Sequence, residues 1–162
     1  MIELKKISIL DDNMKECIEL EVATEQKDSV MPNSINLAYA YNLNARGTHA
    51  VPQAIYADGK MVGLITYVYR IDDKDFGETC YSIWPFMIDK NHQGKGYGKQ
   101  AMQKVLDEIR TMPHGKADNV FASYEPENEI ARKLYASLGF ENTDKKWADE
   151  DDTDIIARLS LK

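Results

Sequence analysis

The chain has 162 residues, of which 43% are hydrophobic and 29% are charged, and its formal net charge at pH 7 is −7. This length suits one domain with a single substantial core, and the composition is that of an ordinary soluble globular protein. The acidic balance argues against a nucleic-acid-binding protein, whose affinity would come from lysine and arginine side chains that contact phosphates. It suggests a cationic substrate without establishing one, because many soluble proteins are acidic.

Neither a membrane segment nor an export signal is predicted. The longest apolar runs, such as residues 61–68, are far below the ~20 residues that a membrane helix needs. The first residues contain no long apolar region of the kind found in signal peptides. Cys17 and Cys80 lie far apart without the spacing of a metal site, so we expect two free thiols in a reducing cytoplasm. The expectation is one cytoplasmic domain over residues 1–162, with no metal site and no membrane or nucleic-acid partner.

The first half of the chain predicts a strand, two helices and three further strands. Residues 2–9 alternate loosely, as an edge strand does, and the apolar residues between positions 14 and 22 fall at helical spacing. A second short helix is expected over residues 35–43. Residues 51–57 and 60–71 are typical of paired strands, because Asp58-Gly59 between them is a strong hairpin turn. A polar loop then leads to a strand over residues 78–88.

The second half predicts two helices and three strands. Apolar residues from 97 to 109 form the stripe of an amphipathic helix, residues 120–124 a short strand, and residues 127–138 a helix that Gly139 ends. Residues 140–147 and 155–161 are expected to close the sheet as antiparallel strands. The fold class is α/β (α+β), with a mixed sheet and helices on both faces. An exposed loop between the last two strands is expected to hold the densest acidic cluster, Asp149, Glu150, Asp151, Asp152 and Asp154.

The most informative stretch is residues 92–99, where Gly94, Gly96 and Gly98 alternate with side chains between a predicted strand and a predicted helix. Glycine lets a ligand approach the backbone closely, and the first amides of a helix are unpaired donors at the positive end of the helix dipole. A phosphorylated ligand is therefore expected here. A Walker loop is excluded because Gln100 follows Gly98-Lys99, and a dinucleotide fingerprint is excluded because the spacing is GxGxG.

Read as Gln93-x-x-Gly96-x-Gly98, this stretch resembles the [QR]xxGx[GA] loop of the GNAT superfamily of N-acetyltransferases. In that superfamily the loop amides hold the pyrophosphate of acetyl-coenzyme A. A six-residue pattern of this kind needs support from elsewhere in the chain.

The support lies one helix and one strand downstream. Asn128-x-x-Ala131-x-x-x-Tyr135-x-x-x-Gly139-Phe140 is similar to the helix that forms the other wall of the cofactor groove in the same superfamily. Each of these residues alone has an ordinary structural explanation, such as a helix C-terminal glycine. Two ordered motifs at matching spacing are hard to obtain by chance, so we interpret the chain as a member of this superfamily.

The resemblance implies a fold, a cosubstrate and a set of site residues. The fold is a central mixed, mostly antiparallel sheet of about seven strands. The superfamily frequently self-associates, and the sequence leaves open whether this chain forms a homodimer. The cosubstrate is acetyl-CoA, with coenzyme A as product, and its pantetheine arm would pair like an added strand with Phe86, Met87 and Ile88. The residues implied at the pyrophosphate are Gln93, Gly94, Lys95, Gly96, Tyr97, Gly98 and Lys99. Asn128 and Ala131 would line the pantetheine, and Tyr135 would lie by the sulfur.

Acetyl transfer to an amine sets two chemical requirements. An alkyl amine with a pKa of about 10.4 must lose a proton, and coenzyme A, with a thiol pKa of about 8.5, must leave. Tyr135 is the candidate acid, because a phenol with a pKa of about 10 can donate to the departing sulfur. The base stays open among Glu78, Tyr81 and Ser82, on the strand that leads to the cofactor.

Histidine titrates near neutrality, but none of the three histidines is assigned a role. His92 occupies a position at which the superfamily commonly carries tyrosine or another large side chain. His49 and His114 lie in predicted loops without a partner.

The acceptor amine is suggested by residues 25–34, which look like the acceptor-side insertion of bacterial spermine and spermidine acetyltransferases. A polyamine carries several cationic nitrogens, so its site should offer spaced carboxylates. Glu21, Glu25 and Asp28 would lie about one helical turn apart if the first helix extended that far, although a solvated helix face explains them equally well. The acidic cluster at residues 149–154 would attract a polyamine electrostatically.

The predicted activity is therefore acetyl transfer from acetyl-CoA to a primary amine, a polyamine such as spermine or spermidine, with Glu25 and Asp28 as acceptor residues. Two alternatives stay open. A protein or peptide N-acetyltransferase would use the same cofactor half, and a non-catalytic coenzyme A-binding sensor would not need Tyr135.

Overall fold

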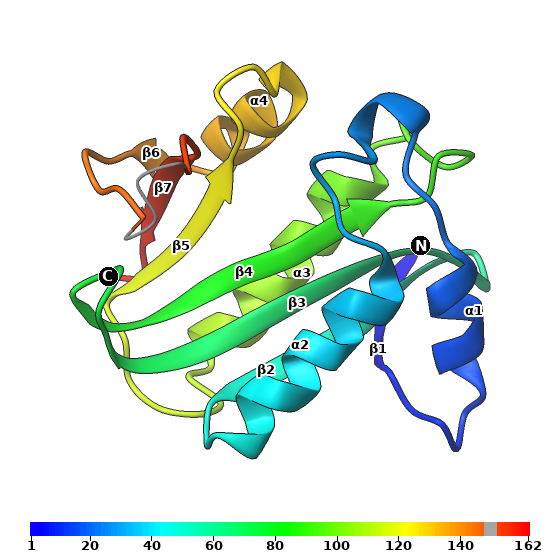
Figure 1. Ribbon diagram of the computed structural model, residues 1–162, viewed down its shortest axis with the longest axis horizontal. Helices are drawn as coiled ribbons and strands as arrows, with labels where there is room; N and C mark the ends of the chain where they lie inside the picture. Colours follow the sequence, from blue (N-terminus) through cyan, green and yellow to red (C-terminus); the bar gives the residue numbers. More distant parts are fainter. Residues whose placement is uncertain (148–151) are drawn as a thin grey trace.

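The structure, a computed structural model, describes residues 1–147 and 152–162. Its elements follow the predicted order of strands and helices, with a short 3-10 helix added after the first helix. None of the described helices is long and apolar enough to cross a bilayer. The element bounds, shown in Figure 1, are β1 (Ile2–Lys6), α1 (Asn13–Glu19), η1 (Thr24–Gln26), α2 (Asn33–Ala45), β2 (His49–Ala57), β3 (Lys60–Asp73), β4 (Glu78–Ile88), α3 (Tyr97–Arg110), β5 (Asn119–Tyr124), α4 (Glu129–Ser137), β6 (Glu141–Asn142) and β7 (Ile155–Ser160).

Several predicted elements are shorter than expected. The strand predicted over residues 2–9 ends at Lys6. α1 ends at Glu19 because the backbone of Leu20 adopts an extended conformation, so the prediction of helix up to residue 22 was wrong. The strand predicted over residues 140–147 is reduced to the two residues of β6. Beyond β6 a local hydrogen bond from Lys145 N–H to the Thr143 hydroxyl, 3.2 Å long, replaces the ladder. The predicted loop residues 149–151 lie outside the described residues.

All seven strands form one sheet in the order β1-β2-β3-β4-β5-β7-β6. Neighbouring strands are antiparallel except β4 and β5, which run parallel because α3 crosses over between them. The hairpin between β2 and β3 turns at Asp58 and Gly59, whose φ angles of 50° and 82° suit the predicted tight turn. The predicted mixed, mostly antiparallel sheet of about seven strands is confirmed.

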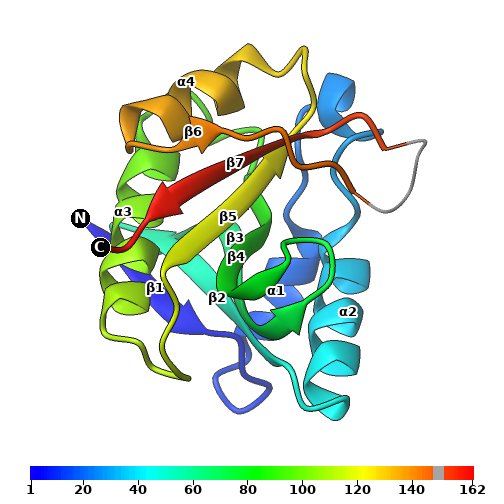
Figure 2. The ribbon, with the colours of Figure 1, turned by 90° about the vertical axis from the view of Figure 1, so that its left-hand side faces the viewer.

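Helices cover both faces of the sheet, as predicted (Figures 1 and 2). On one face α1 and α2 pack over β3, where Cys17 joins Leu64 in one cluster and Ala40 joins Val68 in another. Full burial of a large apolar side chain contributes about 1.5–3 kcal/mol, so these clusters fix the helices firmly. On the other face α3 buries its predicted apolar stripe, Ala101, Met102, Val105, Leu106 and Ile109.

The two cysteines are free, as predicted, and both are fully buried. Burial is the main cause that raises the pKa of Cys17 and of Cys80 to about 12. Because the thiolate is the reactive form, neither thiol is suited to act as a nucleophile near neutral pH.

β4 and β5 pair over only three residues and then separate. The parallel ladder joins Tyr81, Ser82 and Ile83 to residues 120–122. The other edge of β4 pairs with β3, and there the register shifts between Ile65 and Tyr67 of β3. Two residues of β4, 84 and 85, therefore lie opposite one residue of β3, as in a β-bulge. One edge of residues 84–88 in β4 therefore pairs with no described strand, and this edge faces the end of β5 (Figure 1).

Candidate active site

The glycine-rich loop joins this free part of β4 to α3. Gly94 and Gly96 both have a φ of 75°, in the left-handed region that favours glycine, and a Cβ at either position would meet nothing within 4 Å. Gly96 directly precedes Tyr97, the first residue of α3. The open space over these glycines and the unpaired amides of the first helical turn are compatible with the phosphate group that the sequence predicts here.

Gly98 has a different reason to be glycine. It lies inside the first turn of α3, and a Cβ there would approach Phe86 Cζ at 3.2 Å and Ile88 Cγ1 at 3.7 Å. The missing side chain lets α3 come close to the end of β4. The predicted pantetheine strand, Phe86 to Ile88, and the predicted pyrophosphate loop are therefore brought together at one place.

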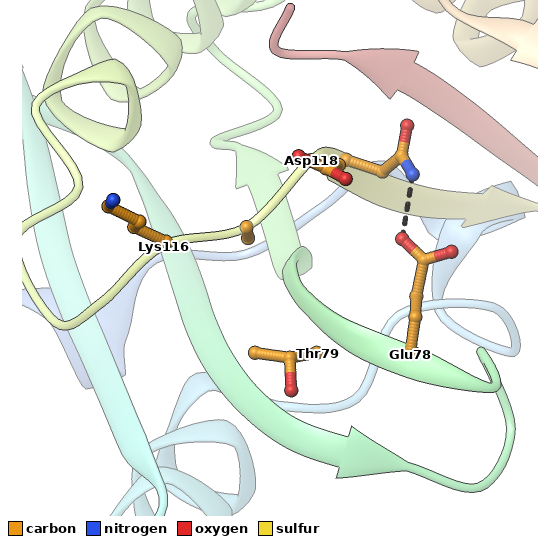
Figure 3. A pocket seen from close by; sticks show the side chains of 6 residues that line it. Glu78, Thr79, Lys116 and Asp118 are labelled. Carbon is orange, nitrogen blue, oxygen red and sulfur yellow. Dashed lines mark hydrogen bonds between the residues drawn. The ribbon is translucent and has the colours of Figure 1, made fainter.

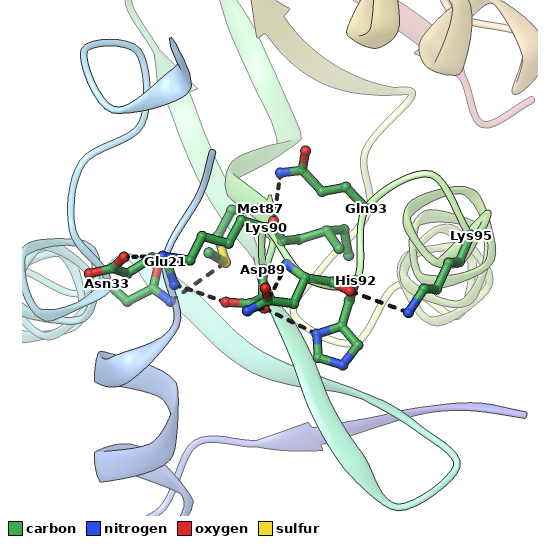
Figure 4. Close-up of polar contacts among 10 residues, drawn as sticks. Glu21, Asn33, Met87, Asp89, Lys90, His92, Gln93 and Lys95 are labelled. Atoms are coloured by element: carbon green, nitrogen blue, oxygen red, sulfur yellow. Dashed lines mark hydrogen bonds and ion pairs between the residues drawn. The ribbon is translucent and has the colours of Figure 1, made fainter. Parts of the chain in front are cut away.

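Asp89 organises the start of this loop (Figure 4). Its carboxylate accepts hydrogen bonds from the Glu21 N–H at 3.2 Å, from the Asn91 N–H at 3.1 Å and from the Asn91 amide group at 3.2 Å, and His92 Nδ1 lies 3.1 Å from it. Burial would raise the pKa of Asp89, but these hydrogen bonds outweigh burial and hold it below its ordinary value. No sequence pattern indicates this role, because one aspartate after a strand is an ordinary loop residue.

Gln93, the first residue of the loop motif, is also fixed by the structure. Its Nε2 donates to the backbone oxygen of Ile88 at 2.9 Å and to Gln26 Oε1 at 2.7 Å. Lys95 donates to the backbone oxygen of Asn91 at 3.2 Å, so its side chain folds back along the loop. The Lys99 side chain is exposed.

The second motif forms the beginning and the buried face of α4. Asn128 caps the helix, because its side-chain oxygen accepts the N–H of Ala131 at 3.0 Å. Tyr135 is only 6% exposed, and its ring lies 5.8 Å from that of Tyr124 and 5.4 Å from that of Phe140. Burial raises the pKa of Tyr135, so the phenol stays protonated and able to donate a hydrogen.

The predicted acceptor residues lie on the segment between α1 and α2. Glu25 and Asp28 are exposed, and because α1 ends earlier they do not share one helix face with Glu21. Glu21 instead pairs with Lys90 at 2.7 Å, beside the glycine-rich loop (Figure 4). The segment also reaches the opposite side of the site, where the Ser29 hydroxyl donates to Glu125 Oε2 at 2.7 Å.

A cavity of about 280 Å³ lies at the separation of β4 and β5, on the face of the sheet that carries α1 and α2. Two tryptophans and two aspartates give it an acidic and aromatic character, so we call it the acidic aromatic pocket. Its aspartates, Asp152 and Asp154, belong to the acidic cluster that the sequence singled out, whereas the tryptophans beside them were not anticipated. The pocket is lined by Arg70, Phe76, Ser82, Ile83, Trp84, Phe121, Ala122, Ser123, Trp147, Asp152 and Asp154.

The charges in this pocket are unequal. Arg70 Nη1 lies 3.3 Å from Asp73 Oδ2, and Arg70 Nε donates to the Ser82 hydroxyl at 2.8 Å, so its positive charge is compensated locally. Asp152 and Asp154 then leave the pocket negative. Burial and the charge of Asp152 raise the pKa of Asp154. A negative pocket with aromatic walls can hold an organic cation.

Of the three predicted base candidates, only Ser82 lines the acidic aromatic pocket. Tyr81 donates its hydroxyl hydrogen to Gly115 O at 3.0 Å, in the cluster under α3. Glu78 lies at the far end of β4, accepts a hydrogen bond from Asn119 at 2.7 Å, and lines a separate polar cavity of about 380 Å³ (Figure 3). Glu78 is therefore removed from the place where β4 and β5 part.

The histidines are likewise placed away from the pocket. His92 contacts Asp89 in the glycine-rich loop. The prediction that His49 and His114 have no partner was wrong, because their rings stack on each other with centroids 4.7 Å apart. The two residues are distant in the sequence, so only the folded chain brings them together.

Comparison with known proteins decides the family. A sequence profile of the acetyltransferase (GNAT) family matches residues 13–140. The chain belongs to the GNAT family. It is an acetyl-CoA-dependent N-acetyltransferase, and the fold and acetyl donor expected from the two motifs are confirmed. The residues predicted to bind the donor lie in this GNAT enzyme on the glycine-rich loop, the free edge of β4 and helix α4.

Named relatives of this GNAT enzyme differ in their acceptors. The spermine/spermidine N(1)-acetyltransferase of Bacillus subtilis strain 168 is 24% identical over 135 residues, which cover 83% of this chain and 85% of the relative. The L-2,4-diaminobutyric acid acetyltransferase of Nocardia farcinica is 27% identical over 103 residues, covering 64% of this chain and 50% of the relative. An aminoglycoside acetyltransferase, AAC(6')-Ib in complex with coenzyme A, has a TM-score of 0.70 at 13% identity, over 99% of this chain and 95% of that one.

Proposed function

We propose that this GNAT enzyme acetylates a primary amine of a polyamine such as spermidine or spermine. The observation that carries the proposal is the acidic aromatic pocket beside the place where β4 and β5 part. Asp152 and Asp154 supply negative charge, and Trp84 and Trp147 supply aromatic faces on which a cation can rest. A polyamine has a reacting nitrogen and further cationic nitrogens, and the pocket offers groups for both.

The donor half of the site follows the assignments made from the motifs. The amides of residues 93–99 receive the pyrophosphate, with Lys95 and Lys99 near its outer face. Residues 86–88 pair with the pantetheine, and Asn128 and Ala131 line its other side. Tyr135, protonated because burial raises its pKa, donates to the departing sulfur. Each role rests on the position of the residue around the separation of β4 and β5.

Two exposed carboxylates outside the pocket complete the proposal for the acceptor. Glu25 and Asp28 are exposed on the segment that crosses from the glycine-rich loop toward Glu125. There they would meet the distal cationic nitrogens of a long polyamine. Such contacts would be weak and sensitive to salt, because both carboxylates are solvated.

The test is an acetylation panel read by release of the coenzyme A thiol. Spermine, spermidine, short diamines and peptide amines are compared at equal acetyl-CoA concentration, and products are identified by mass. We expect kcat/KM for spermidine to exceed that of the best peptide at least about tenfold, and KM to rise with salt. Preference for peptide amines would identify a protein acetyltransferase. Tight binding of acetyl-CoA without turnover of any amine would identify a sensor.

A second candidate acceptor is a diamino acid, and Arg70 is the observation that favours it. Its guanidinium lines the same pocket, and two of its N–H donors are used in the contacts to Ser82 and Asp73. The remaining donors suit a carboxylate. Adding 2,4-diaminobutyrate to the panel separates the candidates, because Arg70→Gln should raise KM for the diamino acid and leave KM for spermidine unchanged.

A further inference from the structure

Amine acetylation, the proposed function on which this section rests, requires a group that accepts the proton of the attacking nitrogen. The acidic aromatic pocket offers few such groups. Arg70 is a permanent cation, and Asp73 is held beside it at 3.3 Å. The Ser82 hydroxyl is engaged by Arg70 Nε at 2.8 Å. The carboxylates of Asp152 and Asp154 remain.

These two carboxylates differ in position. Asp152 is exposed, whereas Asp154 is half-buried. Asp154 directly precedes Ile155, the first residue of β7, which pairs with Tyr124 at the end of β5. The N–H of Asp154 donates to Asp152 Oδ1 at 2.9 Å, which holds the backbone between the two acids. Asp154 therefore lies where β5 ends and has parted from β4.

Asp154 also lies near the proposed proton donor. The connection runs through Tyr124, which pairs with Ile155 in the sheet and whose ring lies 5.8 Å from that of Tyr135. Ser123 of β5 lines the same pocket as Asp154. Asp154 thus lines the acceptor pocket and is adjacent in sequence to Ile155, whose strand partner Tyr124 packs on Tyr135.

We infer that Asp154 is the proton acceptor for the attacking amine. The acceptor arrives as an ammonium ion and first loses one proton to solvent. Its neutral nitrogen attacks the thioester carbon, so that the N–C bond forms and the C–S bond breaks. The nitrogen gives a proton to Asp154, and Tyr135 gives its proton to sulfur. Asp154 then releases its proton to solvent and Tyr135 recovers one from solvent, which leaves the acetylated amine, the coenzyme A thiol and one proton in solvent.

The environment of Asp154 strengthens it as a base. Burial raises its pKa, the charge of Asp152 raises it further, and the hydrogen bond from Ser123 opposes the rise. A carboxylate whose pKa is closer to the working pH takes up a proton more readily and is still ionised before the reaction.

The experiment compares Asp154→Asn with Asp152→Asn at saturating acetyl-CoA, on the amine of the panel that wild type turns over fastest. Asp154→Asn should lower kcat at pH 7 about 100-fold or more. Asp152→Asn should raise KM for the amine, because Asp152 belongs to the acceptor pocket. The matched control for kcat is Asp118→Asn, which changes an exposed carboxylate at the separate polar cavity and should keep kcat within about threefold. Calorimetric binding of coenzyme A should be unchanged in Asp154→Asn and Asp152→Asn, and Asp154→Glu should recover part of the lost kcat.

The pH profile provides a readout that a structural role would not move. In wild type at low pH, log kcat should rise with a slope approaching about two, because both an ionised Asp154 and a neutral amine are needed. In Asp154→Asn the slope should be about one. An unchanged slope with kcat within about threefold of wild type, or loss of coenzyme A binding in Asp154→Asn, overturns the inference.

The failure of the proposed function gives a different result. Turnover of peptide amines in place of polyamines contradicts the polyamine acceptor. In that case the ratio of kcat between wild type and Asp154→Asn, measured with the peptide, still tests the role of Asp154. Absence of turnover with every amine contradicts both.

Discussion

Replacement of Tyr135 by phenylalanine removes one hydroxyl group and keeps the ring. The ring contacts to Tyr124 and Phe140, at 5.8 and 5.4 Å between centroids, are retained. Positioned acids contribute about 10²- to 10⁴-fold, and we expect the lower end because a thiol with a pKa of about 8.5 is already a fair leaving group. The expected loss in kcat is about 100-fold, or about 2.7 kcal/mol of activation free energy.

The assay measures kcat by thiol release, acetyl-CoA affinity by calorimetry and the midpoint of thermal unfolding. Tyr135→Phe should leave affinity and midpoint nearly unchanged. Tyr67→Phe is the matched control, because it removes a phenol that donates to Glu108 at 2.9 Å under α3. It should lower the free energy of unfolding by about 2 kcal/mol and leave kcat unchanged. A near wild-type kcat for Tyr135→Phe would refute the role of the phenol.

Three further predictions concern the loop and the thiols. Gly96→Ala and Gly47→Ala both place a side chain at a left-handed φ, 75° and 83°, with open space around it. Both variants should therefore lose about 1 kcal/mol of stability, but only Gly96→Ala should weaken acetyl-CoA binding in calorimetry. Equal affinities of the two variants would contradict the phosphate site. Asp89→Asn should lower the free energy of unfolding by about 2 kcal/mol at pH 7. Because the pKa of Asp89 is held below its ordinary value, its contribution to stability is present above about pH 4 and is lost as pH falls through the folded-state pKa. Denaturant titrations should therefore show that the stability difference between Asp89→Asn and wild type shrinks at low pH. A stability difference that stays constant with pH would count against the assignment. Cys17 and Cys80 have pKa values raised to about 12 and no exposed surface. Both should therefore resist a thiol reagent at pH 8 in the native protein and react with it in denaturant. Rapid labelling of the native protein would contradict their burial.

The residues proposed for the donor half of the site could be identified because they form local sequence patterns. A loop that brings backbone amides to a phosphate needs glycine at fixed spacing, so Gly94 and Gly96 reveal it without the fold. Asn128 and Tyr135 are likewise tied together by the turn of one helix. The order of elements followed for a similar reason, since apolar spacing and the Asp58-Gly59 turn act over short distances.

The acceptor half depends on contacts between residues that are far apart in the chain. Asp154 and Trp84 come together only because the chain from β4 returns through α3 and β5 to β7. The carboxylates that sequence reasoning favoured, Glu25 and Asp28, rested on a helix that ends earlier. The two-residue length of β6 could not be predicted because local hydrogen bonds at Thr143 override an alternating pattern.

The most direct test of the account is a crystal structure of the enzyme with coenzyme A and spermidine. The account predicts the pyrophosphate on the amides of residues 94–98, the sulfur within hydrogen-bonding distance of the Tyr135 hydroxyl, and an amine nitrogen of spermidine in the pocket beside Asp154. Spermidine bound away from Asp152 and Asp154, or a sulfur out of reach of Tyr135, would contradict it.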